Sequence, residues 1–287
     1  MVGVVPRLPQ HDGPVELDEV SVQAGGAAAI AAATVTSLGC KARLCTKVAD
    51  DFLGPFILHA LAQAGLAVHE VLGPQSRLSA FGFTAAAREG GRRMSFVTNG
   101  DVGDMVPDEV DLEGMLDGSS AVIIDGYFPA AQIALAERAR LRDVPVVLGC
   151  VRMREGMGEL VGLSDVLIAS ERLASELAPR GEVRDSLTEL SRMGPRAVIL
   201  TLGEAGSIGL HDGTLVEQPA YPVDVVDSCD AASVYLGAFV TALLNRLPFA
   251  RCMEFASAAA SLSCRRVGAW AGIPDRDEVL DLIRKNR

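Results

Sequence analysis

Apolar residues recur in short, uninterrupted runs through the middle of the chain, and each run has the length and β-branched content of a buried strand. Stretches with the composition of helices, residues 130–141 and 171–178, follow the first and the third run. The runs are residues 121–127, 144–149, 165–170 and 196–203. Strands that are apolar on both faces and alternate with helices form parallel sheets that helices cover on both sides. The pattern therefore predicts an α/β sandwich with a mostly parallel central sheet.

A β-hairpin is predicted where this pattern is interrupted. Two runs of β-forming residues, 78–87 and 92–98, flank a glycine-containing tip. A hairpin inserted in this way often covers a site at the edge of the main sheet. We expect residues 76–100, with part of 1–24, to form a small β lid on a single domain that spans residues 1–287.

Composition narrows the class of protein. The chain has 26 basic and 37 acidic residues and a net charge of −11, so its surface should repel phosphodiester backbones, and we expect no nucleic-acid partner. The six cysteines lack metal-site spacing, which is typical of buried thiols in a reducing compartment. No segment reaches the ~20 apolar residues of a membrane span, and no secretory signal is apparent. A globular cytoplasmic protein without a membrane partner is expected.

Two loops precede predicted helices in a way that favours anion binding. Gly25 and Gly26 precede an alanine-rich helix, and residues 227–233 connect a strand to a long apolar helix. Free amides and the helix dipole favour negative charge at a helix start, and ligands of open α/β sheets bind at the carboxyl ends of strands. Tight turns with small capping residues would give the same pattern, so both interpretations stay open.

The order of these segments resembles the ribokinase-like (PfkB-type) carbohydrate kinases over nearly the whole chain, and in particular the ketohexose-kinase-like branch. The matching segments are GGAAAIAAATVTSLG, VADDFLG, the hairpin, SDVLIASERLASEL, TLGEAGS, VDSCDAASVYLGAF and FASAAASLSCRRVGAWAGIP. The resemblance implies a three-layer α/β/α sandwich with a β-hairpin lid, with ATP and Mg²⁺ as cosubstrates. It also implies transfer of the γ-phosphoryl group to a sugar hydroxyl. Some relatives pair through their lids, so a homodimer through the lid is a further expectation.

The resemblance assigns the catalytic turn to the start of the long helix. In the family a Gly-Ala-Gly-Asp turn supplies the anion hole and the catalytic base. The matching residues are Asp230, Ala231, Ala232 and Ser233, with Asp227 as the acid that opens the motif. Ser233 has no useful basicity near pH 7, and general-base assistance is typically worth about 10²–10⁴-fold. The charge of Asp230 would oppose phosphate binding. Three roles for Asp230 stay open: a helix N-cap, a relocated base and a magnesium ligand.

The residues that match the family's sugar contacts also differ from the family pattern. The resemblance places substrate contacts at Asp12, Gly25, Gly26, Ile30 and Arg93. Ile30 stands where the family has a sugar-binding asparagine, and an isoleucine cannot form a hydrogen bond with a hydroxyl. The family's first strand has no convincing counterpart before Pro6. A start upstream of Met1 would restore that strand.

The nucleotide side is better matched. Thr201, Gly203 and Gly206 correspond to the family's ATP-contacting segment, where glycine permits close approach of the backbone. A plain glycine turn would have the same sequence. The family's Asn-x-x-Glu motif aligns with residues 170–173, which leaves Glu171 as the acid for magnesium.

Two functions are consistent with this set of residues. The chain is an ATP-dependent sugar kinase that uses Asp230 or Asp227 as a substitute base. Alternatively, it is an inactive relative, a pseudokinase, that binds a nucleotide, a sugar or a protein as a regulator or scaffold.

Overall fold

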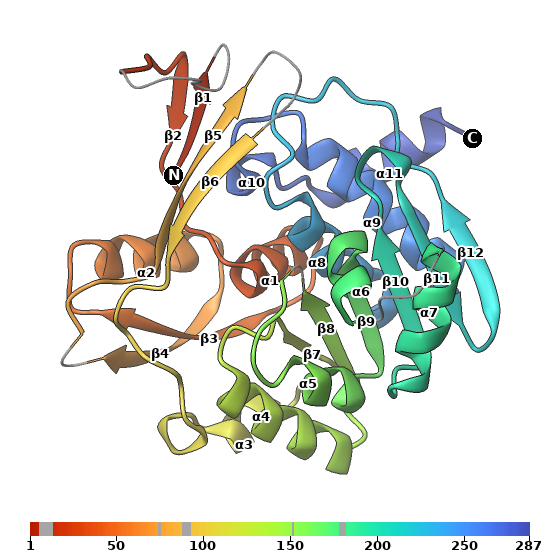
Figure 1. Cartoon of the computed structure of the whole chain (residues 1–287), viewed down its shortest axis with the longest axis horizontal. Helices are drawn as coiled ribbons and strands as arrows, with labels where there is room; N and C mark the ends of the chain where they lie inside the picture. The colour runs from red at the N-terminus through yellow and green to blue at the C-terminus, as the bar shows by residue number, and fades with distance from the viewer. Residues whose placement is uncertain (6–13, 74–75, 88–92, 151, 178–181) are drawn as a thin grey trace.

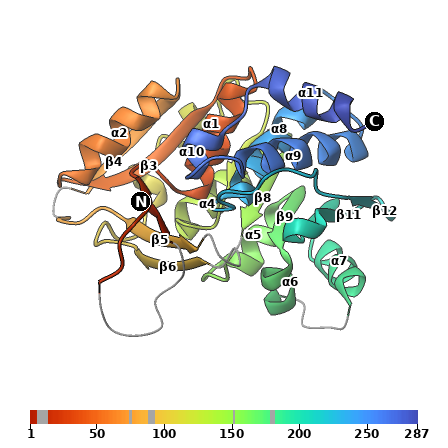
Figure 2. The same cartoon turned by 90° about the horizontal axis from the view of Figure 1, so that it is seen from above.

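The computed structural model describes residues 1–5, 14–73, 76–87, 93–150, 152–177 and 182–287. Its main sheet has six strands in the order β12-β11-β10-β9-β8-β7, and two smaller sheets have the orders β2-β1-β5-β6 and β3-β4. Helices lie on both sides of the main sheet (Figures 1 and 2). The expected α/β sandwich with a mostly parallel central sheet is confirmed.

The main sheet contains the four apolar runs that the sequence predicts as strands. The parallel strands are β7 (Val122–Ile124), β8 (Val146–Cys150), β9 (Val166–Ser170) and β10 (Ala197–Thr201). An antiparallel hairpin of β11 (Ser207–His211) and β12 (Thr214–Gln218) completes the sheet. Strands that are covered on both faces must be apolar along their length, which explains why the runs are continuous.

Alternate residues of these strands enter two separate cores. Ile168 and Ile199 pack with one set of helices, whereas Leu167 and Leu200 pack with the other. The first set is α1 (Ala27–Ser37), α8 (Ala231–Leu244), α9 (Phe249–Ser263), α10 (Ala269–Gly272) and α11 (Arg276–Lys285). The second set is α4 (Pro129–Leu141), α5 (Met157–Leu163), α6 (Glu171–Leu177) and α7 (Val183–Arg192). Figure 2 shows α8, α9 and α11 on the side of the sheet opposite to α6 and α7.

Small residues let α1 and α8 pack in close contact. A Cβ on Gly237 of α8 would overlap the carbonyl oxygen of Ala31 and would lie 2.7 Å from the Cβ of Thr34. The alanine-rich sequence of α1 therefore fits against a glycine on its partner. This close crossing brings the first turns of both helices to the same edge of the main sheet.

A four-stranded sheet, here called the lid sheet, lies beside this edge. Its strands are β1 (Val2–Val5), β2 (Glu19–Ser21), β5 (Phe81–Ala87) and β6 (Arg93–Thr98). The predicted β5–β6 hairpin is confirmed. The expectation of no strand before Pro6 is wrong, because Val2–Val5 pairs with both β2 and β5. Val2 and Val4 also pack against Val267, a contact that the short N-terminal sequence could not reveal.

Several elements have no clear sequence signal. The strand β4 (Ala67–Gly73) is polar in its centre and pairs with β3 (Arg43–Ala49) in a separate sheet. The helix α2 (Leu53–Gln63) lies between these two strands in the chain. The short helix α3 (Leu112–Leu116), as well as α5 and α7, is not predicted. No helix in the described ranges is long and apolar enough to cross a membrane, and a cytoplasmic location stays a prediction.

Candidate active site

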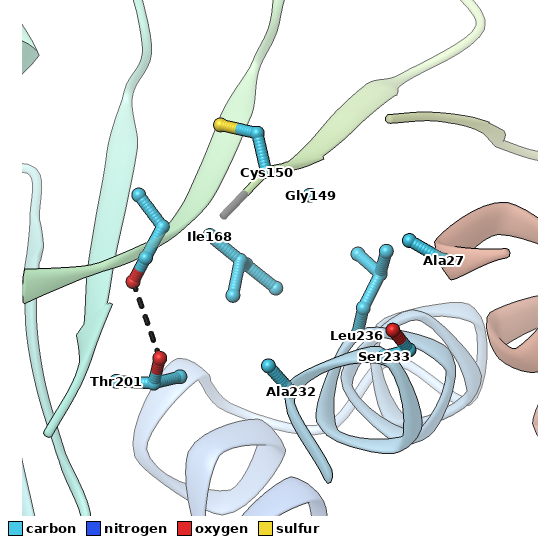
Figure 3. Close-up of a pocket in the computed structure, with 9 residues that line it drawn as sticks. Ala27, Gly149, Cys150, Ile168, Thr201, Ala232, Ser233 and Leu236 are labelled. Carbon is cyan, nitrogen blue, oxygen red and sulfur yellow. Dashed lines mark hydrogen bonds between the residues drawn. The ribbon is translucent and has the colours of Figure 1, made fainter. Parts of the chain in front are cut away.

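The carboxyl ends of β8, β9 and β10 meet the first turns of α1 and α8 around a small cavity (Figure 3). The residues that line it are Ala27, Gly149, Cys150, Ile168, Ala169, Thr201, Ala232, Ser233 and Leu236. Its volume is about 10 Å³, which is on the scale of one water molecule. The structure thus brings together three residues that the sequence singled out: Thr201, Ala232 and Ser233.

The first turn of α8 presents backbone amides at this cavity. The amides of Ser233 and Val234 donate to the carbonyl oxygen of Asp230 at 2.8 and 3.2 Å. The amides of Ala231 and Ala232 come first in the helix and have no acceptor within it. Amides of this kind, at the positive end of a helix dipole, favour a phosphate group. The anion hole at this turn stays a prediction.

Asp230 holds the N-cap position of α8 in an unusual conformation. Its φ of 58° and ψ of 12° are left-handed, and its side chain makes no capping hydrogen bond. Side-chain capping therefore does not explain why an aspartate stands here. Its roles as a substitute base or as a magnesium ligand stay predictions.

Asp227 is buried and holds the turn in place. Its Oδ1 accepts a hydrogen bond from the amide of Cys229, and its Oδ2 accepts one from the amide of Gly268, both at 2.8 Å. Only 4% of the residue is exposed. Because both carboxylate oxygens hold backbone amides, the geometry supports a structural role for Asp227 and does not support its use as a base.

Ser233 lies in the cavity wall, and only 7% of it is exposed. Among the described residues that line the cavity, none carries a carboxylate. Burial raises the pKa of the neighbouring Cys150 thiol to about 12, so this thiol stays protonated and cannot serve as a base near neutral pH. The cavity therefore offers hydroxyl groups and amides but no group with useful basicity.

The nucleotide-side candidates differ in their surroundings. Thr201 Oγ1 donates to the carbonyl oxygen of Ala169 at 3.4 Å, as Figure 3 shows. Gly206 has a φ of 93°, and a Cβ there would overlap the carbonyl oxygen of Gln218, so packing of the hairpin requires this glycine. Gly203 has a φ of 61°, and a Cβ there would meet no atom within 4 Å. The open space over Gly203 leaves room for a ligand.

The start of α1 contributes exposed glycines and a buried isoleucine. Gly25 and Gly26 are exposed, and the φ of Gly26 is 99°. Ile30 is only 1% exposed and belongs to the core that α1 shares with α8. Ile30 therefore contributes packing, and it is absent from the residues that line the cavity.

The remaining candidates are not brought to the cavity. Asp12 lies outside the described residues, and so does the side chain of Arg93, although its backbone pairs with Ala86 in the lid sheet. Glu171 is exposed at the first position of α6. No group of three or more potential metal ligands occurs in the part of the chain that the structure describes. Magnesium is usually held by one or two carboxylates together with substrate phosphates, so Glu171 stays a candidate as a single acid.

Asp125, directly after β7, was not singled out in the sequence analysis. Its Oδ2 accepts from the amide of Ala28 at 3.2 Å, and its Oδ1 accepts from the amide of Tyr127 at 2.9 Å and from Gln132 Nε2 at 2.8 Å. This carboxylate joins the end of β7 to the start of α1. An acid immediately after an apolar strand was the available signal, because that position lies at the ligand-binding edge of a parallel sheet.

In open α/β sheets, ligands bind at the carboxyl ends of the strands, and helix starts at that edge favour anions such as phosphate. The chain belongs to the pfkB family of carbohydrate kinases, and the match to this family covers residues 2–276. This finding confirms the family resemblance of the sequence, and the placement in the ketohexose-kinase-like branch stays a prediction.

Individual relatives support the same family. A ribokinase of Haemophilus influenzae is 25% identical over 268 residues, which cover 90% of this chain and 87% of the relative. An ATP-dependent ribose-1-phosphate kinase of Halopiger xanaduensis is 28% identical over 280 residues, which cover 96% of this chain and 91% of the relative. The structure of ribokinase from Giardia lamblia superposes with a TM-score of 0.86 at 20% identity and covers 100% of this chain and 96% of that one. The ribokinase-like fold is thereby confirmed.

Proposed function

We propose that this chain transfers the γ-phosphoryl group of ATP to a hydroxyl group of a small sugar-like acceptor, without a carboxylate base in the cavity. The family is one of carbohydrate kinases, and the name of one relative specifies ATP as the donor. The observation that carries the proposal is the first turn of α8, where the amides of Ala231 and Ala232 begin the helix that lines the cavity.

Phosphoryl transfer depends mainly on positioning and on stabilisation of charge that spreads over the phosphoryl oxygens. Helix-start amides stabilise such charge. The Ser233 hydroxyl can orient an acceptor hydroxyl through a hydrogen bond, but it cannot hold the proton near pH 7. Bound magnesium would neutralise phosphate charge, with Glu171 as the candidate acid to hold it. We therefore expect a slow reaction rather than none.

The test is acceptor-dependent ADP release with MgATP, measured across ketoses, aldoses, sugar acids and nucleosides. We expect slow release by the wild type and an increase in kcat of about 10²–10⁴-fold in Ser233→Asp, because the variant supplies a base. Ser233→Asn introduces a side chain of nearly the same size without a basic group, so it should not raise the rate. Absence of acceptor-dependent release in both wild type and Ser233→Asp would contradict the proposal.

The pseudokinase alternative is favoured by one observation, the lack of a carboxylate among the described residues of the cavity wall. It predicts no acceptor-dependent turnover in the wild type, whether the pseudokinase binds a nucleotide, a sugar or a protein. The two functions are therefore separated by turnover and not by ATP binding, which calorimetry would detect for a kinase and for a nucleotide-binding pseudokinase.

We further propose that two copies of the chain pair through the lid sheet. The strand register places four exposed apolar side chains on one face of this sheet: Val20, Phe81, Met94 and Phe96. Phe96 is the most exposed of the four, at 60%. Contiguous apolar surface of this kind is typical of a protein–protein contact.

A further inference from the structure

A polar cluster beside the cavity has no role in the reaction proposed above. Tyr127 lies between β7 and α4, and Arg154 lies between β8 and α5. The guanidinium carbon of Arg154 lies 4.5 Å from the centre of the Tyr127 ring, within the range of a cation–π contact. Both residues follow the carboxyl ends of strands, and Asp125 ties this region to the start of α1. The cluster therefore lies at the edge of the sheet where substrates of such folds bind.

The Tyr127 hydroxyl is buried and has no hydrogen-bond partner in the described part of the chain. Buried polar atoms are nearly always bonded, so each exception calls for a partner such as water or a ligand. Burial raises the pKa of this phenol, Arg154 opposes the rise and Asp125 adds to it. The hydroxyl is therefore protonated at neutral pH and can donate a hydrogen bond.

Arg154 is also without a carboxylate partner among the described residues, whereas Arg184 and Arg251 of this chain form ion pairs. A guanidinium group has five donors and no acceptor. The Asp125 carboxylate is already engaged by the amides of Ala28 and Tyr127 and by Gln132 Nε2. The cluster thus offers donors from Tyr127 and Arg154, while its one carboxylate is engaged by donors of the chain.

We propose that Arg154 and the Tyr127 hydroxyl bind an oxyanion on the acceptor substrate, so that the acceptor is an acidic sugar with a carboxylate or a phosphate group. The inference rests on the proposed function, because it specifies the acceptor of that reaction. Carboxylate and phosphate oxygens only accept hydrogen bonds, and they match the planar fork of arginine. A neutral polyol would also need acceptors for the hydrogen bonds that its hydroxyl groups donate. The Asp125 carboxylate fits that need poorly, because it already accepts hydrogen bonds from the chain.

Calorimetric titration of the full chain without ATP tests this proposal with two matched pairs of ligands. One pair is gluconate and glucitol, and the other is ribose 5-phosphate and ribose. We expect the acidic member of at least one pair to bind about tenfold or more tightly than its neutral partner. The pair that shows the preference tells whether the oxyanion is a carboxylate or a phosphate. Equal affinity within both pairs would overturn the proposal.

Substitutions of arginine test whether Arg154 causes the tighter binding of the acidic ligand. Arg154→Gln should reduce it to about threefold or less, whereas Arg152→Gln, which removes an exposed charge two residues away, should leave it intact. Equal losses in both variants would mean a general charge effect and would overturn the proposal. Circular dichroism of both variants checks that the fold is retained.

The Tyr127→Phe variant tests whether the Tyr127 hydroxyl binds the ligand or stabilises the fold. The variant should bind the acidic ligand about threefold or more weakly with an unchanged or higher Tm, because the hydroxyl has no described bond to lose. A lower Tm with unchanged affinity would assign the hydroxyl a structural role and contradict the proposal.

The result is distinguishable from failure of the proposed function. If ATP binds and ADP release depends on a neutral acceptor, the phosphotransferase proposal stands and the oxyanion proposal fails. If an acidic ligand binds through Arg154 but no ADP is released with it, the oxyanion site stands and the phosphotransferase proposal fails.

Discussion

At the scale of single residues, Asp230 is the least expected feature of the site. It adopts a left-handed backbone conformation at the start of α8, which costs most residues about 1–2 kcal/mol and which glycine adopts freely. It also places a carboxylate beside the helix-start amides, where phosphate would bind. Both effects are local, so substitutions can separate them.

We predict that Asp230→Gly raises the free energy of unfolding by about 0.5 kcal/mol, because relief of the left-handed conformation outweighs the larger entropy of the unfolded chain. ATP affinity should rise about threefold or more at low salt and less at high salt. Asp230→Asn removes the charge but keeps a side chain that tolerates this conformation, so it should raise ATP affinity with little change in stability. Unchanged ATP affinity in both variants would show that this carboxylate does not oppose phosphate.

At the scale of elements, the close crossing of α1 and α8 places the two helix starts together. Gly237 contacts Ala31 and Thr34 so closely that any side chain must push the helices apart. The consequence reaches the site, because Ala27 and Ser233 line the cavity from opposite helices.

We predict that Gly237→Val lowers the free energy of unfolding by about 3 kcal/mol, at the upper end for overpacking, and weakens ATP binding. Gly158→Ala is the matched control, because a Cβ on this helical glycine of α5 would meet no atom within 4 Å. It should stabilise the chain by up to about 1 kcal/mol through helix propensity. Denaturant unfolding and calorimetry provide the measurements, and equal effects of the two substitutions would contradict this packing argument.

Elements with local patterns could be predicted, and those set by distant contacts could not. The apolar runs of β7 to β10 are visible because each strand is buried on both faces. In contrast, β1 is defined by pairing with β5, which lies far away in the chain, and by contact with Val267. The same holds for the site: Ser233 could be found from motif position, whereas the unpartnered hydroxyl of Tyr127 depends on burial that no local pattern encodes.

At the scale of the whole molecule, the lid sheet would join two copies through its apolar face. We predict a dimer by light scattering coupled to size exclusion, and a monomer for Phe96→Glu, because a buried unpaired carboxylate opposes association. Phe52 is 82% exposed at the start of α2, outside the lid sheet, so Phe52→Glu should leave the dimer intact. A wild-type monomer at micromolar concentration would contradict pairing through the lid.

Phosphoryl transfer without a carboxylate base in the cavity is tested most directly by the pH dependence of kcat. Acceptor-dependent ADP release should be compared for wild type and Ser233→Asp between about pH 4 and pH 8. We predict a slow wild-type rate without an acid limb, and a faster variant whose rate falls as its new carboxylate is protonated, at a pH above its ordinary pKa of about 4 because position 233 is buried. A wild-type rate that falls in the same acidic range would mean that a carboxylate such as Asp230 already serves as the base, and would contradict the claim.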